Sequence, residues 1–269
     1  GKRLIREVAD EIKLLDDSLL EVNKILNLST DEMDKFVKKA YSMGEAISRT
    51  GRDMIDATGT MVKAGFSNLD EAMDFANLAL SMKNVGDNMN DVERNANVLI
   101  STMKGFGDES VQFAERTLNV LNEVSNTSAI TFSDLAEAFT RTSAVYSQAE
   151  VSIESLAGLI TGSNEIIQNI EKSSSGLLII SQRLRQVTSG FEEDPENLSK
   201  LDGALERIAN VDIQDTTGQL RDTYSILTDI AKVYPTLTKN EQAYLGELIA
   251  GKRQISVFQA LMANWEKVE

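Results

Sequence analysis

Apolar residues recur alternately three and four positions apart at the start of this chain, and this spacing restricts its fold more than any other sequence feature. The residues of this heptad seam are Ile5, Val8, Ile12, Leu15, Leu19, Val22 and Leu26. Such spacing lines up apolar side chains along one side of an α-helix. We therefore predict that residues 1–28 form one long, coiled-coil-like helix.

Two interpretations of this helix stay open. The seam could be an association surface that forms a coiled coil, including one with a second copy of the chain. Alternatively, the helix could pack against its own domain, because Leu14, Leu20 and Ile25 widen the apolar stripe beyond a strict seam.

The rest of the chain shows helix starts and stops at short intervals. Ser29 with Glu32, and Thr238 with Glu241, have the spacing of a capping box, in which each residue satisfies a backbone N–H of the other. The chain has only 2 prolines, and both lie at expected helix boundaries, since proline interrupts a helix interior. We predict an all-α fold of about ten to thirteen helices joined by short capped turns.

The expected helices cover most of the chain after residue 29. Their ranges are 30–49, 67–82, 92–105, 110–124, 131–149, 152–170, 173–187, 197–209 and 219–234, with Asp53 capping another helix between the first two. We expect residues 210–218 to be extended rather than helical. Residues 29–193 are predicted to form a helical core and residues 194–269 a C-terminal helical part, divided at the acidic stretch 192–197.

A short pattern of residues recurs 64 positions further along the chain. The aligned pairs are Asp70 with Asp134, Ala72 with Ala136, and Phe75 with Phe139. A shared offset of this kind raises the hypothesis that a helical hairpin is duplicated.

The composition excludes several kinds of chemistry. The chain has no His and no Cys, which removes thiol and imidazole catalysis, disulfides and the zinc sites built on these residues. Its net charge of −15 argues against specific nucleic-acid binding, because such binding relies on Lys and Arg. We expect no cofactor and no metal, and we interpret the carboxylates of 192–197 as partners of a helix N-terminus. No apolar run approaches the roughly 20 residues that span a bilayer.

The sequence GELIAGKR at 246–253 raises a nucleotide-binding alternative. Gly246, Gly251 and Lys252 match all but the last position of a phosphate-binding loop. Such a loop needs a strand before it and a Ser or Thr after the lysine, whereas a helix pattern precedes this stretch and Arg253 follows the lysine. We instead predict a joint between two helices. Gly251 would be left-handed there, and Lys252 and Arg253 would lie beside the last carbonyls of the first helix.

Several short motifs surround this joint. A D-x-x-G-x-x-R-D element comes first, and an A-G-x-R-Q joint and an F-x-A-L-M stretch follow, while an S-x-R-L-R ending closes the earlier helix 173–187. Together these motifs resemble the core region of phage tail tape measure proteins, most clearly over about 113–265. The residues that carry the motifs are Arg183, Arg185, Asp215, Gly218, Arg221, Asp222, Gly251, Arg253 and Gln254.

The resemblance implies a structural role without enzyme activity. Tape measure proteins are made in the host cytoplasm, occupy the tail lumen of the virion, determine tail length during assembly and leave ahead of the genome at ejection. A helix suits this task because it rises about 1.5 Å per residue, so length can follow sequence. The implied partners are other tail proteins, namely the tube, the tip or baseplate and tail chaperones, together with further copies of the chain. Because the chain begins with Gly1 rather than Met, we expect it to be a segment of a longer protein.

Two other classes of function remain as alternatives. A membrane-active helical module, making contact with the host membrane, could aid passage of the genome through the envelope. The side chains proposed to meet the bilayer are Met54, Met61, Phe66, Met73 and Phe75. A glycosidase needs two carboxylates, and the candidate pairs are Glu150 with Glu154 and Glu165 with Glu171. Liposome leakage and cell-wall lysis would distinguish these alternatives from a structural role.

Overall fold

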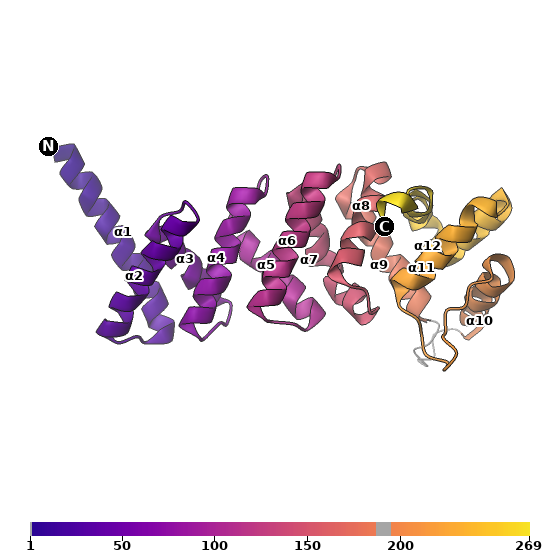
Figure 1. Ribbon diagram of the computed structural model, residues 1–269, viewed down its shortest axis with the longest axis horizontal. Helices are drawn as coiled ribbons and strands as arrows, with labels where there is room; N and C mark the ends of the chain where they lie inside the picture. Colours follow the sequence, from indigo (N-terminus) through magenta and orange to yellow (C-terminus); the bar gives the residue numbers. More distant parts are fainter. Residues whose placement is uncertain (1, 187–194) are drawn as a thin grey trace. The chain divides into compact units, whose positions relative to one another are not determined.

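A computed structural model describes residues 2–186 and 195–269 of the chain, and in this range the protein is all-α, as predicted (Figure 1). The α-helices are α1 (Lys2–Leu26), α2 (Thr30–Ala46), α3 (Gly51–Lys63), α4 (Leu69–Val85), α5 (Val92–Phe106), α6 (Val111–Thr127), α7 (Phe132–Gln148), α8 (Ile153–Ile167), α9 (Ile170–Gln186), α10 (Pro195–Ala204), α11 (Thr223–Val233) and α12 (Lys239–Ala263). Three shorter turns are the π-helical η1 (Leu205–Ala209) and the 3₁₀-helical η2 (Tyr234–Thr236) and η3 (Trp265–Lys267).

Capping side chains determine where many of these helices begin. Both predicted capping boxes are present: Ser29 with Glu32 starts α2, and Thr238 with Glu241 starts α12. Each box satisfies two backbone N–H groups that have no partner within the helix. The hydrogen bonds from Thr238, first from its hydroxyl and then from its backbone N–H, lower the pKa of Glu241.

Several predicted boundaries are corrected by a few residues. A third capping box starts α3, in which Thr50 is the N-cap and Asp53 is the partner three residues later, so Asp53 is not the cap itself. The helix predicted to reach residue 49 ends at Ala46. The helix predicted from 219 begins only at Thr223, because the Asp222 side chain accepts from the Ser225 N–H at 2.8 Å and caps it there.

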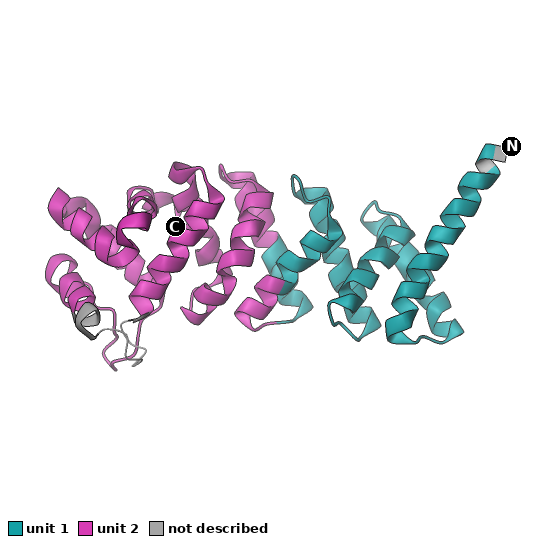
Figure 2. Cartoon of the chain, turned by 180° about the vertical axis from the view of Figure 1, so that it is seen from behind, with its two compact units in different colours: residues 1–100, 109–118 teal, residues 101–108, 119–269 magenta. Residues whose placement is uncertain are grey.

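The contacts of the described residues divide the chain into two compact units (Figure 2). Unit 1 comprises residues 1–100 and 109–118, and unit 2 comprises residues 101–108 and 119–269. The division passes through α5 and α6. The separate sequence-based division at 28/29 and 193/194 stays a prediction.

In unit 1, α3 packs against α1, α2 and α4. Methionine contributes much of the core. The fully buried methionines are Met54, Met61, Met73, Met82 and Met89. Phe36, Phe75, Ile55 and Leu80 are also buried there. The flexible thioether side chain of methionine can fill such a core even where the gaps are irregular.

In unit 2, α9 packs against α7, α8, α11 and α12, and α12 also packs against α8. Leucine and isoleucine dominate its core, as at Leu135, Leu159, Ile160, Leu177, Ile180, Leu227, Ile230, Leu245 and Leu261. Glycines allow close approach: a Cβ added to Gly176 in α9 would lie 2.5 Å from the Val257 Cβ of α12. The fully buried Tyr146 hydroxyl donates to the Leu177 carbonyl at 2.8 Å, and burial raises the pKa of this tyrosine.

The two stretches related by the 64-residue offset lie on α4 and α7. Each is a helix of 17 residues. Ala72 and Phe75 are buried on the first, and Ala136 and Phe139 on the second. The matched burial agrees with the hypothesis of a duplicated hairpin, which stays a hypothesis.

Candidate functional site

The predicted joint at Gly251 lies inside α12. The backbone of Gly251 is not helical, and it divides α12 into two helical arms. Gly251 has φ 70° and ψ 165°. The positive φ agrees with the prediction, but ψ is far from the left-handed helical value of about 47°. Because this backbone region is open almost only to glycine, a side chain at position 251 would be strained.

Arg183, from the last turn of α9, holds this joint. Its Nη1 donates to the carbonyls of Leu248 at 3.2 Å and Glu247 at 3.4 Å. Its Nη2 lies 2.7 Å from the place that a Cβ on Gly251 would take. The cation that donates to these carbonyls is therefore Arg183, whereas the sequence predicts Lys252 and Arg253. Arg183 is 65 positions away from Leu248 in the sequence and reaches it because α9 packs against α12.

The phosphate-loop alternative finds no support at this joint. Gly246 lies within the first arm of α12, where an added Cβ would be 2.9 Å from Ile255 Cγ1 of the second arm. The Lys252 side chain is 84% exposed and lies 3.6 Å from the Glu247 carboxylate. These glycines therefore bend a helix, and Lys252 pairs with a neighbouring acid.

The D-x-x-G-x-x-R-D motif forms the turn that leads into α11. The Asp215 carboxylate accepts from the hydroxyl and N–H of Thr217 and from the N–H of Gln219, and these hydrogen bonds lower its pKa. Gly218 occupies a positive φ of 81°. A single antiparallel bridge joins Gln214 to Leu220 and closes a tight turn over 214–220. The stretch 210–218 is therefore non-helical, as predicted; Val211 and Ile213 are buried and Asp212 between them is exposed, but its second half is a turn rather than extended.

Arg221 and Asp222 connect this turn to the helix that follows it. Arg221 donates to the Asp212 carbonyl at 2.7 Å and to the Asp229 carboxylate at 2.6 Å. The hydrogen bond from Arg221 is the main reason that the pKa of Asp229 is lowered. Asp222 caps α11. The side chains of the motif residues in this turn therefore bind nearby backbone groups and, through Arg221, the Asp229 side chain of α11.

The structure brings some of the motif residues together and separates others. Arg183 and Gly251 are in contact, whereas the Asp215–Asp222 turn is a separate element. Arg185 is half-buried in the last turn of α9. Arg253 is exposed, and the Gln254 side-chain oxygen is buried without a hydrogen-bond partner among the described residues. No local sequence signal pairs Arg183 with Gly251, because the contact depends on how α9 and α12 pack.

The heptad seam of α1 divides into a covered and a free part. Val22 is buried, and Leu15, Leu19 and Leu26 are half-buried. The first three seam residues are exposed, with Ile5 at 71%, Val8 at 54% and Ile12 at 56%. The helix thus packs against its own unit at one end, as one interpretation predicts, and leaves the seam open at the other.

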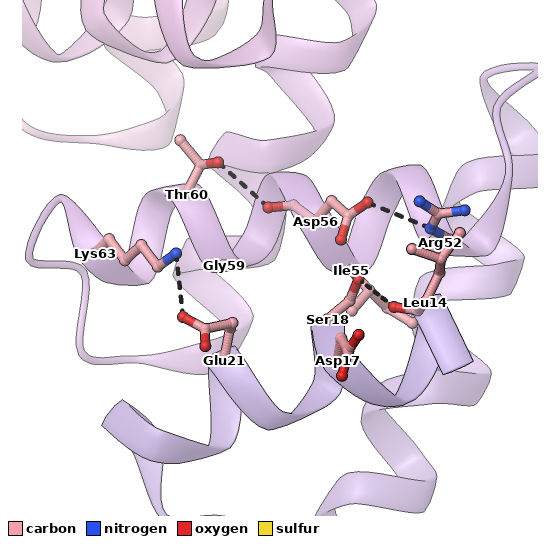
Figure 3. Close-up of a pocket in the computed structure, with 10 residues that line it drawn as sticks. All are labelled: Leu14, Asp17, Ser18, Glu21, Arg52, Ile55, Asp56, Gly59, Thr60 and Lys63. Carbon is pink, nitrogen blue, oxygen red and sulfur yellow. Dashed lines mark hydrogen bonds and ion pairs between the residues drawn. The ribbon is translucent and has the colours of Figure 1, made fainter. Parts of the chain in front are cut away.

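A groove of about 250 Å³ lies beside the seam, between α1 and α3 (Figure 3). Opposite charges meet across it: Lys63 lies 3.3 Å from Glu21, and Arg52 lies 3.1 Å from Glu11. Hydrogen bonds from Lys24 and then Lys63 lower the pKa of Glu21, and the hydrogen bond to Glu11 raises the pKa of Arg52. These ion pairs join α1 to α3 at the groove.

The side chains proposed to meet a membrane lie in the core or at its edge. Met54, Met61, Met73 and Phe75 are buried, and Phe66 is half-buried with its ring 4.6 Å from that of Phe75. Among the described helices, none combines the length and the apolar character that a membrane-spanning segment needs.

The carboxylates proposed as glycosidase pairs either interact with other side chains or are exposed to solvent. Glu165 accepts from the Asn264 side chain at 3.1 Å, and Glu171 lies 3.6 Å from Arg141. Glu150 and Glu154 are exposed beside the turn before α8. Within residues 2–186 and 195–269, no group of acidic side chains could hold a metal ion. The side chains of the acidic stretch 192–197 lie outside the described part.

The sequence model of the family described as phage-related minor tail protein matches residues 37–251. The match spans most of the chain, so this protein belongs to that family, which supports a structural role in a phage tail and a place in the virion. The matched range includes the Asp215–Asp222 turn and ends at Gly251, but it does not include α1. No solved structure matches the chain.

Proposed function

We propose that this chain is a segment of a tape measure protein, which occupies the tail lumen, determines tail length during assembly and takes part in genome ejection. Family membership supplies the tail context. The observation that carries the finer proposal is the use of the motif residues. Arg183, Gly251, Arg221 and Asp222 all shape or cap helix ends. Such residues serve a chain of jointed helices whose function depends on its length and form.

The proposed function needs no catalysis. The acidic surface suits a chain that shares a tube with DNA and must not adhere to it, because like charges repel. The proposed partners are the tail tube, the tip or baseplate and the tail chaperones. The cytoplasm of the host is the proposed place of synthesis.

Tail length in a phage that encodes the chain tests the proposal directly. In-frame deletion of α4 to α7, residues 69–148, removes about 80 residues and should shorten the tail by up to about 120 Å. A smaller deletion of residues 69–106 should shorten it by about half as much. The exposed change Gly203→Ala is the matched control and should leave the length unaltered. Electron microscopy of purified tails measures all three, and unchanged length in both deletion phages would reject a role in length determination.

Ejection needs a second measurement on the same phage. An antibody against the chain should detect it in intact virions and fail to detect it in the particles that remain after DNA release. Retention of the chain in emptied tails would reject the ejection role, whatever the tail length.

A further inference from the structure

A single residue makes the bend of α12. Gly251 is the one position inside this helix whose backbone angles are not helical, and it separates the first arm, residues 239–250, from a distal segment, residues 252–269. The helix contains no proline, and glycine adopts positive and negative φ at similar cost. A change of φ and ψ at this one position would therefore join the two arms into one continuous helix.

The distal segment fits closely against α8 and α9. A Cβ added to Gly176 of α9 would lie 2.5 Å from the Val257 Cβ, and one added to Gly162 of α8 would collide with the Val268 side chain. The Asn264 side chain donates to the Gly162 carbonyl at 3.1 Å. These contacts make α8 and α9 a fitted site for the distal segment.

A single copy of the chain cannot straighten α12 and keep both arms buried in their present places. The first arm buries Leu245 and Ile249, and the distal segment buries Val257 and Leu261. Around a continuous helix, Leu245 and Val257 would lie about a third of a turn apart. Straightening would pull the distal segment away from its own α8 and α9 and expose its apolar side chains to water, which is unfavourable. A second copy would offer the same fitted site and cover them again.

We propose that Gly251 is the hinge of a domain-swapped dimer, in which α12 straightens and the distal segment of each copy packs on α8 and α9 of the other. Such an exchange re-forms the same contacts between copies, so the partner is a second copy of this chain. In the bend, the Leu248 carbonyl accepts from Arg183 at 3.2 Å. In a continuous helix it would accept from the Lys252 N–H instead. Arg183 therefore favours the bent monomer. The proposal rests on contacts within unit 2 and does not depend on a tape measure role.

Gly251→Ala should act in opposite directions on the two forms. In the bend, the added Cβ would be strained at φ 70° and would lie 2.7 Å from Arg183 Nη2, whereas a continuous helix favours Ala over Gly. Light scattering of the full chain over a concentration series should therefore give the variant a dimer Kd at least about tenfold lower than that of the wild type. Arg183→Gln should lower the Kd as well. Gly203→Ala, where the added Cβ meets nothing within 4 Å, is the matched control and should leave the Kd unchanged.

Cross-linking between two copies identifies the exchange itself. The chain has no Cys, so an introduced cysteine is the only thiol. Glu165 and Asn264 lie side by side, 3.1 Å apart through their side chains. One full chain carries Glu165→Cys and the other carries Asn264→Cys, and both keep Gly251. When the two are unfolded in urea and refolded together at high protein concentration, a short bismaleimide should join them. Refolding the same mixture at high dilution, which favours the monomer, is the control and should remove this product.

Three results would overturn the proposal. A folded Gly251→Ala chain could dimerise no more strongly than the wild type, which would show that Gly251 is not a hinge. The refolded mixture could contain dimers without the cross-link between positions 165 and 264, which would show association without exchange. Dimers could also disappear in the double variant Ile5→Ser, Ile12→Ser, which would place the contact on the α1 seam. If Gly251→Ala does not fold, the cross-linking experiment decides, because its chains keep the glycine.

Discussion

The two units of this protein are built from the same kind of element but fill their cores in different ways. Unit 1 buries methionines between α3 and α4, among them Met54, Met61 and Met73, whereas unit 2 buries leucines and isoleucines and brings α9 close to α12 at Gly176. Methionine has flexible torsions and adapts to irregular space, while branched side chains in contact with glycine allow few alternatives. Unit 1 should therefore tolerate changes of core volume better than unit 2.

Large-to-small substitutions should show the largest difference. Leu159→Ala in unit 2 is expected to cost about 4 kcal/mol of unfolding free energy, and Met73→Ala in unit 1 about 2 kcal/mol, because neighbouring methionines can move into the space. Both side chains are fully buried. Hydrogen exchange resolves the two units, and the single tryptophan, Trp265, reports by fluorescence on unit 2 alone. Equal costs would remove the distinction between the cores.

Adding a methyl group to a buried helical glycine should change the free energy of unfolding in opposite directions in the two units. Gly176→Ala in unit 2 is expected to cost about 2 kcal/mol, because the new Cβ would lie 2.5 Å from the Val257 Cβ. Gly59→Ala in unit 1 meets only Val22 Cγ2, at an ordinary 3.5 Å. This change should stabilise the protein by about 0.5 kcal/mol through helix propensity. Thermal unfolding measures both, and a stabilising Gly176→Ala would contradict the close packing.

Helix caps should not distinguish the units, because capping is local. Thr50→Ala in unit 1 and Thr238→Ala in unit 2 each remove the N-cap of a complete capping box and should each cost about 1 kcal/mol. Urea unfolding of the two variants gives the values. A cost several times larger for one of them would show that its cap also supports the tertiary packing of that unit.

The smallest expected effect is a dependence on pH in unit 2. The hydrogen bond from Arg221 lowers the pKa of Asp229 in the folded chain below 3.8, the ordinary pKa of an aspartate side chain. The stabilisation is therefore complete above the ordinary pKa, which applies to the unfolded chain, and is lost as the pH falls through the lower pKa of the folded chain. Because the pair is partly exposed, it should contribute only about 0.5 kcal/mol or less. Asp229→Asn should flatten the acid limb of stability against pH, and an unaltered limb would show that Arg221 does not stabilise the charged form.

The helices themselves were predictable because their signals are local. Ser29 and Thr238 were identified as caps from residues three positions away, and both boxes are present. The sequence predicts the helix that begins at Thr223 four residues too early, whereas the side chains of Asp215 and Arg221 hold the residues before it in a turn.

The candidate site was predictable only in part. The residues of the Gly251 joint were identified, but its cation was not, since Arg183 lies on another helix. The seam of α1 was recognised along its whole length. Which part stays exposed depends on where α3 begins to pack against α1, at the Arg52–Glu11 pair, and no spacing within α1 shows that.

By itself, the order of residues determined that this protein is helical, where most helices start and that one of them bends at Gly251, because caps, apolar spacing and glycine act over a few neighbouring positions. Tertiary structure alone decided that Arg183 contacts the bend, that the buried methionines gather mainly in one core and the leucines in the other, and that Ile5, Val8 and Ile12 face outward. These features arise from contacts between distant segments. Their free energy comes from surfaces that exist only once the helices have packed.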